Sequence, residues 1–126
     1  MKILRKETAP RYERDRITSY LLVSERTCES RNLTTTLVEM QPHGVQRVHS
    51  HEPEQMYYIL EGEGIMTVGN ETKNVSAGDC IFLPAGVPHG LENKANTALR
   101  YLSAASPSFT KQQADTLWPL RGSADE

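Results

Sequence analysis

Short stretches of apolar and β-branched residues recur along the chain, and turn residues separate them. Seven stretches have the length and composition of strands: residues 17–24, 33–41, 45–51, 56–61, 65–69, 80–84 and 97–105. Glycine and proline supply the turns, because glycine accepts unusual backbone angles and proline fixes one. Few stretches have the spacing of a long amphipathic helix. The number and spacing of these strands predict an all-β domain of the sandwich, jelly-roll or barrel type.

The two ends of the chain differ from this pattern. Residues 1–16 mix basic and acidic side chains, so we expect a solvated N-terminal arm or an edge strand there. Residues 107–126 are expected to form a C-terminal tail with one short helical turn over residues 111–117. Trp118 in this tail is expected to pack on the barrel or on a second subunit. With 126 residues and 14.2 kDa, the chain has the size of a single domain.

Charge and composition argue against several classes of partner. The 14 basic and 16 acidic residues give a net charge of −2, which does not favour nucleic acid as a partner. A membrane span is not expected, because a run of about 18 apolar residues is missing. The start of the chain is too polar for a signal peptide, so we expect a cytoplasmic protein. Cys28 and Cys80 are then expected to be reduced thiols, and Cys80 is expected to lie in the core with Phe82.

Two of the four histidines suggest a metal site. His49 and His51 are two residues apart in an expected strand, so their side chains should face the same side. Two imidazoles on one face can share a divalent metal, but such pairs also occur as exposed or core histidines. His43 lies in the preceding turn and is expected to be a surface residue, with a base at the mouth of the barrel as the alternative.

The residues around the histidine pair have a defined spacing. The first motif contains a glycine, two histidines, a glutamine and a second glycine, at Gly44, His49, His51, Gln55 and Gly62. The second motif contains a glycine, a proline, a glycine, a histidine and an asparagine, at Gly78, Pro84, Gly86, His89 and Asn93.

These two motifs resemble those of the cupin superfamily, and the second is matched at every position. In the first motif, Gly44 precedes His49 by four residues where the family pattern has five, and Gln55 stands where the family usually has glutamate. The resemblance implies a single-domain cupin, a double-stranded β-helix or jelly-roll barrel, with its motif core at residues 44–93. It also implies a homodimer, with the N-terminal strands at the interface. Asn93 is expected to stabilise a turn through its side chain.

The resemblance further implies one divalent transition metal held by His49, His51, Gln55 and His89. Glu54 is the alternative fourth ligand, but on a regular strand it points to the face opposite Gln55. A glutamine leaves the full charge of the ion uncompensated, so the site should attract anionic oxygen ligands more strongly and hold its metal less tightly. Two coordination positions stay open, and Mn, Fe, Ni, Co, Cu and Zn all accept such ligands.

The superfamily hosts many activities, so the fold does not select a reaction. We expect a metalloenzyme of the dioxygenase type acting on a small oxygenated, anionic metabolite. The alternatives are a sugar or keto-acid isomerase or decarboxylase, a non-catalytic binding or sensing module, and a purely structural metal. Tyr57 and Glu54 are the candidate catalytic residues. Arg47 shares the alternation of the histidine pair and is a candidate for binding a carboxylate, or else a solvated arginine.

Overall fold

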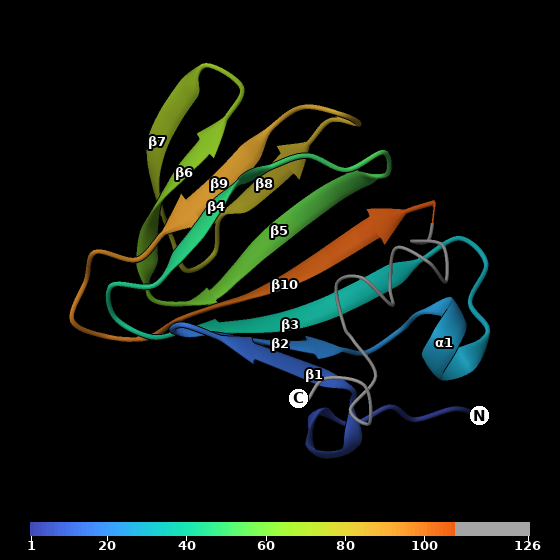
Figure 1. Ribbon diagram of the computed structural model, residues 1–126. Helices are drawn as coiled ribbons and strands as arrows, with labels where there is room; N and C mark the ends of the chain where they lie inside the picture. The colour runs from blue at the N-terminus through green and yellow to red at the C-terminus, as the bar shows by residue number, and fades with distance from the viewer. Residues whose placement is uncertain (108–126) are drawn as a thin grey trace.

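Two antiparallel sheets face each other in the computed structural model, which describes residues 1–107 (Figure 1). The larger sheet has six strands in the order β1-β2-β3-β10-β5-β8. Their bounds are Arg11–Arg14 (β1), Ile17–Leu21 (β2), Thr34–Met40 (β3), Leu99–Ser106 (β10), Glu54–Glu61 (β5) and Cys80–Leu83 (β8). The smaller sheet has the order β4-β9-β6-β7. Its bounds are Val45–His49 (β4), His89–Glu92 (β9), Glu63–Val68 (β6) and Glu71–Ser76 (β7).

This arrangement confirms the predicted all-β fold, and each of the seven expected strands is present. The sequence pattern missed β7 and β9 and left β1 undecided between an arm and an edge strand. β7 has one buried side chain, Val75, so it lacks the alternation that identifies a half-buried strand. β9 has four residues and directly follows a proline turn. β1 is the outermost strand of the larger sheet and pairs only with β2 within residues 1–107.

Helical structure is confined to two short segments of the described chain. They are Lys6–Thr8 (η1) and Glu25–Cys28 (α1), with three and four residues. Neither is long enough to cross a membrane. The predicted helical turn at residues 111–117 and the placement of Trp118 lie outside the described residues.

The hydrophobic core fills the space between the two sheets. Met40, Ile59 and Leu99 have no exposed surface, and Met66 and Leu91 of the smaller sheet pack against the same cluster. The expectation that Cys80 and Phe82 are buried was wrong. Both are exposed, because alternation along β8 turns their neighbours at positions 81 and 83 inward and these two side chains outward.

Asn93 connects the ends of several strands, as its expected role in a turn predicted. Its side-chain amide donates to the carbonyl oxygens of Met40 and Gln41, both at 3.2 Å, and of Thr97 at 2.9 Å. Its side-chain oxygen accepts from the N–H of Ala95 at 3.0 Å. The backbone N–H of Asn93 donates to the carbonyl of Gly44 at 2.9 Å. This residue therefore holds the end of β9 beside the start of β4, and these two strands carry histidines.

Gly62 makes the tight turn between β5 and β6. Its φ is +90°, and a Cβ at this position would lie 2.4 Å from the carbonyl oxygen of Ala98. A side chain there would clash with the backbone, which explains the need for glycine.

Candidate metal centre

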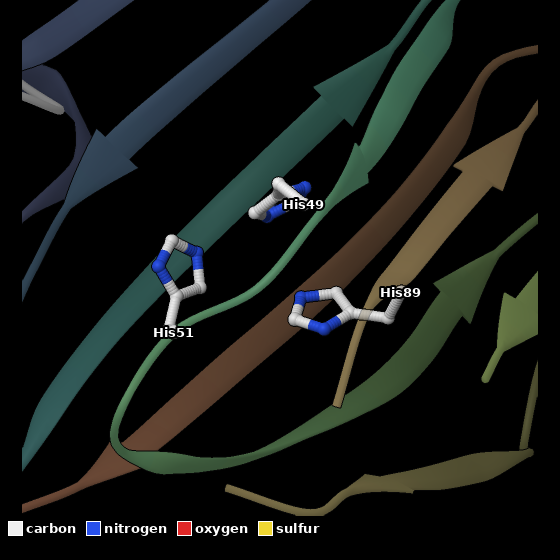
Figure 2. A group of neighbouring side chains, drawn as sticks. All are labelled: His49, His51 and His89. Carbon is white, nitrogen blue, oxygen red and sulfur yellow. The ribbon is translucent and has the colours of Figure 1, made fainter. Parts of the chain in front are cut away.

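Three histidine side chains from two neighbouring strands and a loop lie around one common space (Figure 2). His49 ends β4, His51 lies in the loop that follows, and His89 begins β9 and pairs with His49 across the sheet. The ring centroids of His49 lie 4.6 Å from those of His51 and 4.5 Å from those of His89. One ring nitrogen from each histidine lies within 4.8 Å of the others. The cluster can therefore hold a metal ion.

The backbone reaches this geometry by an irregularity that simple alternation did not predict. The pairing of β4 with β9 shifts register between Gln46 and His49. Gln46 consequently lines the cavity beside the histidines, whereas Arg47 is exposed and lies outside that cavity. The expectation that Arg47 faces the histidine pocket was therefore wrong, because a shifted strand breaks the two-residue repeat.

Backbone carbonyls orient two of the three rings. His49 Nδ1 donates to the carbonyl of Arg47 at 2.7 Å, and His89 Nδ1 donates to the carbonyl of Val87 at 3.2 Å. A carbonyl only accepts, so Nδ1 carries the proton and Nε2 keeps its lone pair. His89 Nε2 is buried and has no hydrogen-bond partner among residues 1–107. This is the arrangement that a metal-binding imidazole requires.

Gln55 offers a second buried acceptor. Its side-chain nitrogen donates to Ser103 Oγ at 3.2 Å, which leaves Oε1 buried without a hydrogen-bond partner in the described part of the chain. Gln55 lines the same cavity as His49 and His51. Glu54 is exposed and is not among the residues that line this cavity.

These two unsatisfied atoms test whether a metal fits the site. Buried polar atoms without a partner are rare and costly, by about 1–3 kcal/mol each. Both orphaned atoms, on Gln55 and His89, are neutral lone-pair donors of the kind that divalent transition metals accept. The donor set therefore fits a divalent ion bound by three imidazoles and one amide oxygen.

The electrostatic environment keeps the histidines in their metal-binding form. Burial, with added repulsion from His49 and His89, lowers the pKa of His51 to about 4. Burial and the neighbouring His49 also lower the pKa of His89. Both rings are thus neutral near pH 7, and a neutral imidazole is the form that coordinates a metal.

The histidines open onto a cavity of about 330 Å³ on the inner face of the larger sheet. Its lining is mostly polar and has no acidic residue among residues 1–107. The residues that line it are Tyr12, Arg14, Ile17, Ser19, Thr36, Val38, Gln46, His49, His51, Gln55, Tyr57, Tyr101 and Ser103.

Two stacked tyrosines form part of this lining. The Tyr57 ring lies 4.3 Å from that of Tyr101 and meets the His89 ring edge-on at 5.8 Å. Burial raises the pKa of Tyr57 and of Tyr101, so both phenols stay protonated and can donate hydrogen bonds. Tyr101 already donates to Gln46 Oε1.

The structure brings Tyr57 to the predicted site but leaves Glu54 and His43 away from it. His43 is exposed in its turn, as expected. Sequence reasoning missed the contribution of β1, because a charged segment near the terminus gives no sign of an enclosed face. The available signal was the two-residue spacing of Tyr12 and Arg14, which places both side chains on one face of a strand.

The Cupin domain family matches residues 36–105, more than half of the chain. The fold and the histidine cluster already define a jelly-roll protein with a candidate metal site, and this match shows that the chain belongs to the cupin family.

Individual relatives show the same similarity over parts of their length. An uncharacterised protein of Methanocaldococcus jannaschii is 39% identical over 71 residues, which cover 56% of this chain and 57% of that protein. An oxalate-binding protein of Thermotoga maritima is 40% identical over 57 residues, which cover 44% and 47%. The chain thus spans about half the length of these relatives. The crystal structure of a predicted oxalate decarboxylase from T. maritima has a TM-score of 0.73 and 23% identity, covers 84% of this chain and 99% of that chain, and supports the fold.

Proposed function

We propose that this cupin holds one divalent transition metal on His49, His51, Gln55 and His89 and uses it to act on a small anionic oxygenated metabolite. The observation that carries the proposal is the pair of buried, unsatisfied acceptors on Gln55 and His89 beside the histidine cluster. A bound metal would supply a Lewis acid for oxygen ligands and, as Fe or Mn, one-electron chemistry with O₂.

The residues of the cavity favour an anion. The fourth ligand is a neutral amide, so the protein does not offset the double charge of the ion. The described cavity lining has no carboxylate that would repel an anion. Tyr57 and Tyr101 remain protonated and can direct hydrogen bonds at an oxygen of the ligand. The similarity to an oxalate-binding protein supports the same class of ligand.

The same lining favours an oxidative reaction over isomerisation. An isomerase must remove a proton from carbon, which requires a base near the substrate. Neither Glu54 nor any other acidic residue among residues 1–107 lines the cavity, and the histidines are assigned to the metal. Tyr57 is the remaining catalytic candidate, as a hydrogen-bond donor that orients a bound oxygen. We therefore place dioxygenase-like chemistry first, ahead of the isomerase, decarboxylase and sensing alternatives.

We also propose that the protein is a homodimer. Support comes from exposed apolar side chains on the outer face of β5 and β8, among them Tyr58, Leu60 and Phe82. This surface lies at the opposite edge of the larger sheet from β1, so it differs from the N-terminal interface that the family resemblance implied.

The first experiment measures metal in protein purified without an affinity tag. We expect about one transition metal per chain in the wild type and in His43→Ala, because the candidate site has one set of ligands and His43 lies outside it. His89→Ala should lose most of the metal. A wild-type protein that binds no transition metal, or a His89→Ala variant that retains it, would contradict the proposed site.

The second step measures O₂ uptake with sugar acids, keto acids and catechols. Oxygen consumption that follows iron or manganese loading would support the dioxygenase. Saturable binding without turnover would instead favour the sensing module, and turnover without O₂ would favour an isomerase or a decarboxylase.

A further inference from the structure

The edge strand β1 forms one wall of the cavity. Tyr12 pairs with Ser19 of β2, Ser19 with Val38 of β3, and Val38 with Tyr101 of β10. These four residues form one row across the sheet, and all four line the cavity. Arg14 is two residues beyond Tyr12, so it shares this inner face, and it too lines the cavity. β1 thus contributes one aromatic and one cationic side chain to the space that contains the candidate metal centre.

Arg14 is the one charged group among the described residues that line this cavity. Within residues 1–107 it forms no ion pair, and its guanidinium instead lies 5.7 Å from the centre of the Tyr12 ring. By contrast, Arg11 on the same strand pairs with Glu13 at 3.5 Å. The charge of Arg14 therefore has no carboxylate partner in the described part of the protein.

This charge acts on the interior of the barrel. Burial and contact with Tyr57 raise the pKa of Tyr101, and the nearby Arg14 opposes that rise by stabilising the phenolate. Arg14 thus influences a phenol that stacks on Tyr57, whose ring in turn meets that of His89. Tyr57 and Tyr101 lie between the cation and the histidine cluster.

The separation of Arg14 from the metal centre limits the size of a molecule that can touch both. β1 and β5 are four strand spacings apart, roughly 19 Å along a flat sheet. The side chains of Arg14 and Gln55 both extend into the cavity and close much of this span, which the curvature of the sheet shortens further. The remaining space suits a short-chain acid with one functional group at each end.

We propose that Arg14 is a specificity-determining residue that binds a second carboxylate of the ligand, so that the preferred ligand is a small dicarboxylic acid. One end of this acid would lie at the metal centre, and the other would meet the guanidinium, which matches a carboxylate in a two-point hydrogen bond. The inference rests on the proposed function, because it assigns a ligand class to the same cavity.

The test uses full-length, metal-loaded protein and two matched pairs of acids. Malate and 2-hydroxybutyrate offer the same chelating end but differ in a distal carboxylate, and 2-oxoglutarate and 2-oxovalerate form a longer pair. Calorimetry without O₂ gives the dissociation constants for the wild type, Arg14→Gln, Arg14→Lys and the control Arg11→Gln. Arg11 lies on the same strand but does not line the cavity.

We expect the wild type and Arg11→Gln to bind at least one dicarboxylate about tenfold or more tightly than its matched monocarboxylate. Arg14→Gln should lose this preference with its metal content and monocarboxylate affinity unchanged, and Arg14→Lys should keep part of it. Equal binding of both members of each pair by the wild type, or a preference that survives in Arg14→Gln, would overturn the role of Arg14 and leave the proposed function intact. Failure of the metal-loaded wild type to bind any of the four acids would overturn the proposed function as well.

Discussion

One side-chain amide sets the charge at the candidate metal centre. Ser103 accepts a hydrogen bond from the nitrogen of Gln55, which fixes the amide so that its oxygen is the atom left for a metal. A glutamate at this position would donate a negative charge to the ion and offset part of its attraction for an anionic ligand. Glutamine thus favours ligand binding at the expense of metal retention.

Gln55→Glu tests this balance. We expect the variant to release its metal to a chelator about fivefold or more slowly than the wild type, because a carboxylate is a charged ligand. Its affinity for small carboxylic acids should fall at the same time. Release rates in the presence of EDTA and acid binding by calorimetry measure the two effects.

Glu54→Gln is the matched control, since Glu54 is adjacent in sequence but exposed. Metal release should be unchanged in this variant. Faster release from Glu54→Gln, together with unchanged release from Gln55→Glu, would instead assign the fourth ligand to Glu54.

At this scale, the sequence predicts side-chain direction wherever a strand is regular. Along β5, Gln55, Tyr57 and Ile59 are all buried, as alternation requires. Along β4 the same rule misplaced Arg47, because the register shift depends on how β4 pairs with β9, which the local sequence does not encode. The place of Arg14 in the cavity was missed for a similar reason, since it depends on which strands lie beside β1.

At the scale of elements, hydrogen bonds from Asn93 hold the two histidine-bearing strands together. Asn93 is fully buried, and its side chain satisfies three carbonyl groups and one N–H from separate loops. His49 and His89 pair across the same two strands. The position of His89 relative to His49 thus depends in part on this asparagine.

Asn93→Ala should destabilise the protein by about 3 kcal/mol, because buried carbonyl groups would lose their donor and a small cavity would form. Urea unfolding monitored by circular dichroism measures the change. Asn70→Ala, in the exposed turn before β7, is the control and should change the stability by less than about 0.5 kcal/mol. A loss for Asn93→Ala as small as that of the control would contradict the role assigned to Asn93.

Strands were predictable from the sequence in proportion to the apolar surface that they bury. β3 and β10 bury alternate or nearly all side chains and were found, whereas β7 buries only Val75 and was not. β7 forms because its backbone pairs with β6 over six residues, from Glu63↔Ser76 to Val68↔Glu71. Backbone pairing of this kind leaves little trace in side-chain polarity.

At the scale of the whole molecule, the outer face of β5 and β8 is unusually apolar for a surface. Tyr58 and Leu60 of β5 are 41% and 42% exposed, and Phe82 of β8 is 58% exposed. The two strands pair so that Met56 lies opposite Phe82 and Tyr58 opposite Cys80, which joins these side chains into one patch. Strands that are apolar on both faces are typical of sheets covered on both sides. Contiguous patches of this kind commonly mark protein interfaces.

A second copy of the chain is therefore expected to cover this patch. Light scattering after size-exclusion chromatography should give the wild type a mass of twice 14.2 kDa. Phe82→Asp should shift the protein toward the monomer, because dimerisation would bury an unpaired carboxylate in an apolar interface. Val48→Asp is the matched control, since Val48 is 60% exposed but lies on β4 of the smaller sheet. A monomeric wild type would contradict the dimer, and a dimer disrupted by Val48→Asp but not by Phe82→Asp would place the interface on the smaller sheet.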